Sequence, residues 1–233
     1  MVYFLLDYTL KRSKRRKTVA IKVAQQQLTV YAPHFVPLGD IESWLVSKKD
    51  WVQAQIAKQA SQAQMQQLPL ETGVINLFNQ PLAIKLNKGR SSHWQQNERS
   101  SELSLSVSSR VKNTESKYLS LLEDFLHHKL ESYLEMRIHD YCLKMQEALP
   151  EQLKVQHYKR RWGSCNQRRE LTFNLHLACA PTWVIDYVIV HELAHLKYMN
   201  HSSVFWQRVS RFYPDYKKAS QWLKVNGSQL RWQ

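Results

Sequence analysis

The sequence is poor in the residues that build disulfide scaffolds, zinc ribbons and membrane spans. It has only three cysteines in 233 residues, at positions 142, 165 and 179. An odd, widely spaced set without a CxxC pair favours neither a disulfide framework nor a zinc ribbon, and it is typical of a reducing compartment. The longest apolar runs, VYFLL and WVIDYVIV, are far shorter than the roughly 20 residues of a membrane-spanning helix.

The order of residues at the N-terminus also differs from that of a secretory signal. The apolar run VYFLL precedes the basic run KRSKRRK, whereas a signal peptide has its basic residues first. We therefore expect a cytoplasmic protein with no membrane partner.

Acidic residues are scarce relative to basic ones. The chain has 19 Asp and Glu against 33 Lys and Arg, which gives a formal net charge of +14. Such an excess favours anionic partners such as nucleic acid or nucleotides. Six of the seven residues at 11–17 are basic. This run is either a solvated hairpin tip or a contact for a nucleic-acid backbone, and the sequence leaves both open. The oligomeric state is equally undefined.

Apolar residues are plentiful and follow two different periods. Alternation over residues 18–31 predicts a β-hairpin, and helical spacing begins at about Asp40. A long amphipathic helix is predicted over residues 116–149, where Pro150 ends it. Strands and helices are mixed without a βαβ rhythm, so the fold class is predicted to be α+β.

The Ser-rich stretch 87–116 predicts a linker or domain edge. We therefore expect two domains. Residues 1–112 would form a β-rich N-terminal region with one helix, and residues 113–233 would form a second domain that contains the motif described next.

The most informative stretch is VIVHELAHLKYMNHSSVFW, residues 188–206. His191 and His195 lie one helical turn apart on one face, so both imidazoles can bind the same metal ion. Glu192 follows the first histidine directly, which is where a general base must lie to take a proton from an activated water. The surrounding helix is apolar on nearly every side. Burying these groups there would cost several kcal/mol, and a bound metal would offset that cost.

A catalytic zinc needs a third protein ligand and one open position. His201 is the candidate, but it lies six residues after His195 and would point away from it on a continuous helix. The helix must therefore break between them, and Asn200 is the expected breaker because Asn tolerates the left-handed conformation. Asp215 or another downstream acid is the alternative ligand. The sequence predicts one bound Zn²⁺, either catalytic or structural.

Four further residues are candidates for substrate binding. Arg160 and Arg161 would hold an anionic group by forked hydrogen bonds. Tyr158 and Tyr198 would donate a hydrogen bond to a developing oxyanion. Each has a simpler interpretation, since exposed arginines are often only solvated and buried tyrosines often only pack.

The predicted strand at 170–177 is the remaining candidate element. As an edge strand it would bind an extended peptide through its main chain, and as an interior strand it would not. Asn174, which lies on it, is a candidate for binding substrate or for supporting the metal ligands from behind.

The segments RRWGSC, LTFNLHL, P..VIDYVIVHELAHL....HS..FW and PDY closely resemble the YgjP-like metallopeptidase family. That family is related to the SprT-like and WLM zinc peptidases. The resemblance implies a zincin-like catalytic domain. His191, His195 and His201 match the family's metal ligands, and Glu192 matches its acid/base residue.

Together these features predict a zinc-dependent metallohydrolase, most simply a peptidase acting on a peptide or protein. Two other functions stay open. One is a metal-dependent hydrolase of nucleotide phosphoanhydrides, suggested by the arginines. The other is a nucleic-acid-associated binding module with a structural metal, suggested by the basic run.

Overall fold

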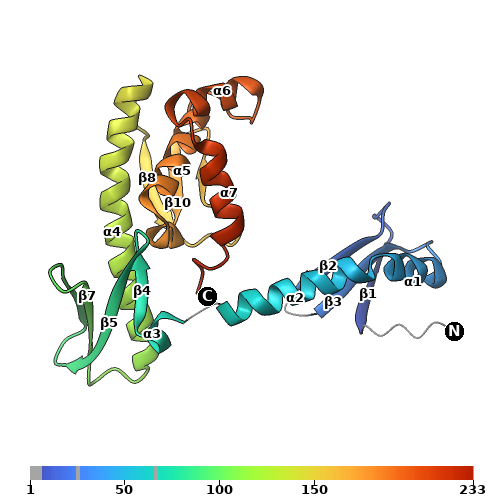
Figure 1. Cartoon of the computed structure of the whole chain (residues 1–233), viewed down its shortest axis with the longest axis horizontal. Helices are drawn as coiled ribbons and strands as arrows, with labels where there is room; N and C mark the ends of the chain where they lie inside the picture. Colours follow the sequence, from blue (N-terminus) through green and yellow to red (C-terminus); the bar gives the residue numbers. More distant parts are fainter. Residues whose placement is uncertain (1–6, 25–26, 66–67, 233) are drawn as a thin grey trace. The chain divides into compact units, whose positions relative to one another are not determined.

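A computed structural model describes residues 7–24, 27–65 and 68–232. The chain divides into two compact units, residues 1–66 and 67–233 (Figure 1). The units are described separately below. Both mix helices with small sheets, so the predicted α+β class is confirmed.

The first unit is a three-stranded sheet covered by a helix. The strands have the order β1-β3-β2, with β3 parallel to β1 and antiparallel to β2. Alternate residues of β3 pack against α1, and the buried core consists of Val30, Ala32, Ile41 and Leu45. The elements are β1 (Tyr8–Ser13), β2 (Ala20–Ala24), β3 (Gln27–Pro33), α1 (Leu38–Ser47) and α2 (Lys49–Met65). The single helix expected from about Asp40 is thus two helices, separated at Lys48.

The second unit begins with a short helix and a four-stranded sheet of order β4-β5-β7-β6. Residues 87–116, predicted to form a linker or domain edge, are instead part of this sheet, because two of its strands lie within them. Along β7 the apolar residues point into the core and serines alternate with them on the other face. These serines make a half-buried strand resemble a Ser-rich linker in composition. The elements are α3 (Pro69–Thr72), β4 (Val74–Leu77), β5 (Gln80–Gly89), β6 (His93–Asn97) and β7 (Glu102–Ser108).

The helix α4 (Thr114–Met145) has 32 residues and confirms the long helix predicted after residue 116. Asn113 caps its first turn by accepting a hydrogen bond from the Ser116 amide. Gln146 ends it in the left-handed conformation, with φ 54°. The helix packs on β6 and β7 with one part and on β8 and α5 with another.

The remaining elements surround α5. The sheet β8-β10-β9 has β10 in the middle, parallel to β8 and antiparallel to β9. These elements are β8 (Gln152–Gln156), β9 (Gly163–Cys165), β10 (Glu170–Asn174), the 3-10 helix η1 (Leu175–Cys179), α5 (Thr182–His195), α6 (Ser203–Phe212) and α7 (Tyr216–Asn226). The strand predicted at 170–177 is therefore interior, and β9 lies at the edge.

A partly buried ion pair joins α5 to α4. Arg137 donates from Nε to Asp186 Oδ1 at 3.0 Å and from Nη2 to Asp186 Oδ2 at 2.6 Å. Tyr133 also donates to Oδ1, at 2.9 Å. The carboxylate is thereby paired and hydrogen-bonded, as a charge buried in a core must be.

The division of the chain at 66/67 differs from the boundary expected at 112/113. Leu103, Leu105 and Val107 of β7 belong to the same core as the buried residues of α4 and α5. The sheet of β4 to β7 therefore folds with the segment that carries His191, His195 and His201, and not with the N-terminal strands. None of the helices in the described part of the chain combines the length and hydropathy that a membrane crossing requires.

Candidate metal centre

The helix α5 presents His191, Glu192 and His195 from its last turn and a half. It ends at His195, and Leu196 is its C-cap. The predicted break before His201 is therefore confirmed. Asn200 is not the breaker, because its φ is not among the positive values of the described residues and the helix ends five residues earlier.

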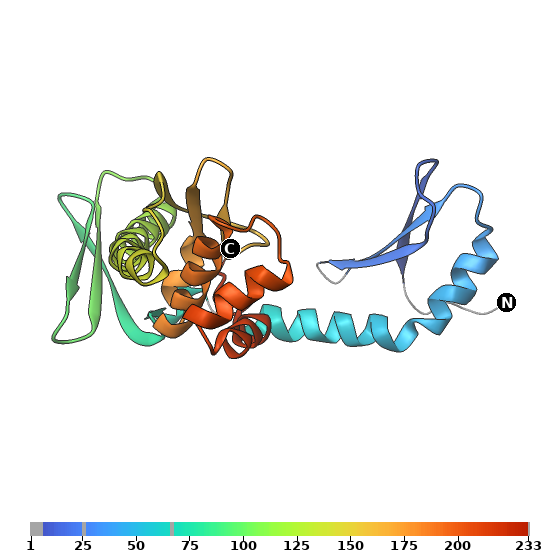
Figure 2. The same cartoon turned by 90° about the horizontal axis from the view of Figure 1, so that it is seen from above.

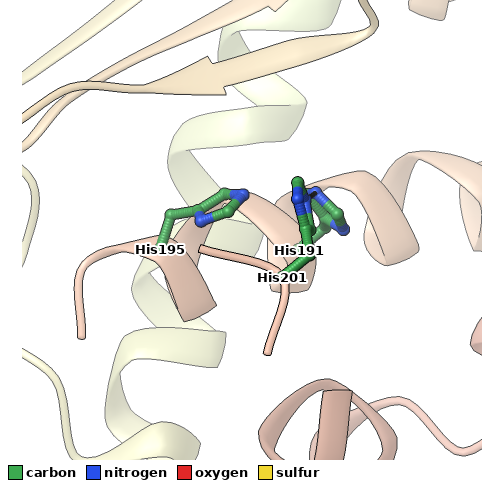
Figure 3. Close-up of side chains that lie close together, drawn as sticks. All are labelled: His191, His195 and His201. Atoms are coloured by element: carbon green, nitrogen blue, oxygen red, sulfur yellow. Dashed lines mark hydrogen bonds between the residues drawn. The ribbon is translucent and has the colours of Figure 1, made fainter. Parts of the chain in front are cut away.

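The three histidines lie close together at the end of this helix (Figure 3). One ring nitrogen from each of them falls within 4.8 Å of the others. His191 Nε2 and His201 Nε2 are 3.1 Å apart, a separation at which two imidazoles share either a proton or a cation. The alternative ligand Asp215 is exposed at the N-terminus of α7 and is not part of this group.

The neighbouring groups fix the orientation of the rings. His195 Nδ1 donates to the carbonyl of Tyr198 at 2.9 Å, which leaves its Nε2 free to bind a metal. Phe205, which is fully buried, lies within 5.0 Å of all three rings, measured between centroids. Trp206 stacks on His201 at 5.6 Å. The start of α6 thus forms an aromatic floor beneath the three imidazoles.

Burial keeps two of these imidazoles neutral. The pKa of His191 is lowered to about 3, chiefly by burial and in smaller part by the nearby His195 and His201. Burial also lowers the pKa of His195, although its hydrogen bond to Tyr198 opposes the change. A neutral imidazole has a free lone pair, and this is the form that binds metals.

The carboxyl group of Glu192 is enclosed between α5 and β9. Its side chain is buried, and burial raises the pKa of Glu192 to about 8, while Arg161 opposes the increase. It lies against the backbone of Gly163, so that a β-carbon at that position would be 2.6 Å from Glu192 Oε1. Only glycine leaves room for the carboxyl group here.

These groups line one open pocket of about 540 Å³. The edge strand β9 and the helix α5 both contribute lining residues, and α7 contributes Ser220, Leu223 and Lys224. The pocket therefore combines three convergent imidazole nitrogens, a buried carboxyl group and a free strand edge.

A family model of YgjP-like metallopeptidase domains matches residues 17–226. The chain belongs to the YgjP-like metallopeptidase family. The resemblance noted in the sequence is thus confirmed, and membership identifies the protein as a metallohydrolase that uses a divalent metal ion.

Among solved structures, this YgjP-like chain is similar to the crystal structure of the metallopeptidase zymogen abylysin from Pyrococcus abyssi. The two are 20% identical, the match covers 42% of this chain and 96% of that chain, and the TM-score is 0.38. No curated protein matches the sequence.

In the structure of this YgjP-like protein, only some of the predicted substrate-binding residues line the pocket. Arg161 lines the pocket, whereas Arg160 is exposed outside its lining. The hydroxyls of Tyr158 and Ser164 are hydrogen-bonded at 2.9 Å, so Tyr158 supports β9 from outside the pocket. Tyr198 contributes its carbonyl to His195, while its side chain packs on the core.

Asn174 is fully buried and supports the segment before β9. Its Nδ2 donates to the carbonyls of Tyr158 and Arg161 at 2.9 and 2.8 Å. Its Oδ1 accepts from the backbone amide of His176. Asn174 therefore positions the backbone of Arg161 through a hydrogen bond. It does not line the pocket itself.

Sequence reasoning missed Gly163 and the residues of α7. Glycine is rare in this chain, with five residues in total, so an isolated glycine within the strand-like RRWGSC was a usable signal of close backbone approach. Ser220, Leu223 and Lys224 carry no comparable signal, because only the packing of α7 on α5 brings them to the pocket.

Proposed function

We propose that the chain is a zinc-dependent peptidase in which His191, His195 and His201 hold one Zn²⁺ and Glu192 is the general base. One observation carries this proposal. Three imidazole nitrogens converge within 4.8 Å, in a pocket that also contains a buried carboxyl group. The pocket is about 540 Å³ in volume, large enough for several atoms of an extended substrate.

The donor set fits zinc. Zinc accepts three imidazoles and keeps a fourth position for water or substrate, and two nitrogens on one tetrahedral ion are roughly 3.3 Å apart. The separation of 3.1 Å between His191 Nε2 and His201 Nε2 agrees with that value. The hydrogen bond from His195 Nδ1 to a carbonyl is the usual support for a histidine that binds through Nε2.

When bound, the ion would supply Lewis acidity that polarises the scissile carbonyl and makes a water molecule more acidic. Glu192 would take the proton from that water and later pass it to the leaving amine. The buried carboxyl group must be ionised to begin this sequence. Arg161, which already lowers the pKa of Glu192, supports the ionised form.

The edge strand β9 would bind the substrate backbone. Its residues line the pocket, and β10 pairs with only one of its edges. An extended peptide added to the free edge would gain main-chain hydrogen bonds with little sequence preference. Arg161 and Lys224 would pair with acidic groups of the substrate, because both line the same pocket.

All three cysteines are free. Free thiols are typical of proteins in reducing compartments. We place the activity in the cytoplasm on this ground.

The test is to measure bound metal and peptide cleavage in the wild type, Glu192→Gln and His201→Ala. We expect Glu192→Gln to keep one equivalent of zinc and to lose cleavage by a factor of at least about 10². His201→Ala should lose both metal and activity. Unchanged cleavage in a metal-loaded Glu192→Gln variant would refute the assignment. Hydrolysis of nucleoside triphosphates without peptide cleavage would instead support the phosphoanhydride alternative.

A further inference from the structure

Seven basic residues of the first unit have no part in the proposed peptidase chemistry. They lie on β1, on β2 and in the connection between these strands, at Lys11, Arg12, Lys14, Arg15, Arg16, Lys17 and Lys22. One of them is structural, since Arg12 Nη1 donates to the carbonyls of His34 and Val36 at 2.9 and 2.7 Å. Within the part of the chain that the structure describes, no ion pair involves the other six.

Strand register places one of these lysines opposite an aromatic residue and a second lysine on the same face. Lys11 of β1 and Ala20 of β2 both pair with Tyr31 of β3. Lys22 pairs with Thr29, the next outward residue of β3. Because side chains alternate across a strand, all of these point to the face opposite to Val30 and the core.

We call this surface the outer face, defined by Lys11, Lys22, Thr29 and Tyr31. The residues of β3 that contact α1 are Val30 and Ala32, on the other face. Figure 2 shows α1 and α2 running along one side of the strands. No described helix of the first unit covers the outer face.

The connection between β1 and β2 adds a further cation to this face. Arg16 lies over the ring of Tyr31, with its guanidinium carbon 4.9 Å from the ring centroid. Next to β3, the side chain of Phe35 is 66% exposed. The first unit therefore carries aromatic surface as well as unpaired cations.

Negative charge is nearly absent from this region. Residues 7–65 contain ten basic and four acidic side chains, a net charge of +6. Three of the acids, Asp40, Glu42 and Asp50, lie on α1 and α2, and the fourth, Asp7, precedes β1. The outer face therefore complements a strongly anionic ligand.

We propose that the outer face of the first unit binds single-stranded nucleic acid. The lysines and the residues of the 14–17 connection would contact successive phosphates. Tyr31, flanked by Arg16, would stack with a base, as aromatic side chains do on the sheets of single-strand binding proteins. A duplex hides the faces of its bases, so stacking on the half-buried ring of Tyr31 favours a single strand. This binding would not require the metal centre.

The experiment is a fluorescence titration of the full-length protein with a labelled thymidine oligonucleotide over a range of salt concentrations. We expect the double variant Lys11→Gln/Lys22→Gln to reduce the slope of log K against log salt by about 1.4, since each phosphate contact on a single strand contributes about 0.7. Tyr31→Ala should weaken binding roughly 5- to 150-fold, whereas Tyr31→Phe should bind as the wild type does.

Matched controls separate this site from the general positive charge. Lys88→Gln/Arg90→Gln removes two exposed cations from the second unit and should leave affinity and slope unchanged. Equal losses in both double variants would overturn the proposal. Tighter binding of a duplex than of the single strand would also overturn it. Heparin, a polyanion without bases, is the last comparison: if Tyr31→Ala and Tyr31→Phe each bind heparin as tightly as the oligonucleotide, the ring does not recognise bases and the proposal fails. If Tyr31→Ala fails to fold, the lysine pair and its control still decide the outcome.

Discussion

The carboxyl group of Glu192 lies directly against the backbone of Gly163, across the gap between α5 and β9. A β-carbon at Gly163 would be 2.6 Å from Glu192 Oε1 and 2.8 Å from its Cγ. The glycine is not part of the cluster of three histidines, yet it defines where the proposed general base can lie. Gly163 is thus a positioning residue for Glu192.

Gly163→Ala should therefore impair cleavage without removing the metal. The added methyl group must displace the Glu192 side chain, and a misplacement of about 1 Å in a reacting group can cost roughly 10²-fold in rate. The loss should appear in kcat, with zinc content unchanged. Gly39→Ala is the matched control, because a β-carbon there would meet nothing within 4 Å. Normal kcat in Gly163→Ala would show that the contact has no role in positioning.

Zinc should stabilise the folded protein through the three histidines. A ligand that binds only the folded state adds about 2.7 kcal/mol when its free concentration is 100 times Kd. We expect chelation to lower the melting temperature of the wild type and zinc to restore it. His201→Ala should abolish this response, while His139→Ala, which removes an exposed histidine of α4, should keep it. A full zinc response in His201→Ala would remove His201 from the ligand set.

The ion pair between Arg137 and Asp186 should contribute to the stability of the second unit. Arg137→Ala would leave a buried carboxylate without its charged partner, at a cost on the order of 3 kcal/mol in the free energy of unfolding. Urea denaturation would measure the loss. Glu135→Ala, an exposed position on the same helix, should change stability by less than about 0.5 kcal/mol.

A double variant tests whether the unpaired charge causes the loss of unfolding free energy in Arg137→Ala. Replacing both partners, Arg137→Met with Asp186→Leu, removes the unpaired charge and should recover part of the stability. No recovery in the double variant would mean that Arg137 acts through packing alone.

His176 should make the metal-free protein sensitive to acid. The pKa of His176 is lowered to about 4, chiefly by burial and in smaller part by the nearby His157 and Arg231. Its Nδ1 lies 3.1 Å from Asn174 Oδ1, and its buried Nε2 has no hydrogen-bond partner, so the neutral ring is the form that fits.

In the unfolded chain this histidine protonates near pH 6.5, well above its pKa in the folded state. Its contribution to stability is therefore complete above pH 6.5 and declines as the pH falls toward 4, by about 3 kcal/mol in all. His176→Gln should show a shallower loss of unfolding free energy over this range, whereas His139→Gln should follow the wild type. Identical pH profiles for His176→Gln and the wild type would contradict this assignment.

The metal motif could be predicted from sequence because its geometry is local. The spacing of His191 and His195 follows from the helical repeat, and the required break before His201 follows from the same arithmetic. The position of the break did not follow, because Leu196 ends the helix in right-handed geometry and not through a left-handed Asn200.

Features that depend on tertiary packing were not predictable in the same way. The serines of β7 alternate with its core residues and gave that strand the composition of a linker. The close approach of Gly163 to Glu192 and the contribution of α7 to the pocket both require the packed structure. Asn174 was identified as important, but its hydrogen bonds show that it supports the backbone near the pocket.

The length of α4 has a practical consequence for anyone who wishes to isolate the hydrolase. One end of this helix packs on β6 and β7, and another part packs on α5. A fragment starting at residue 113 would therefore expose to solvent the apolar surface of α4 that the sheet of β4 to β7 covers. Such a fragment should aggregate on expression. A truncation that begins at residue 68 keeps both partners of the helix and is the shorter chain to try first.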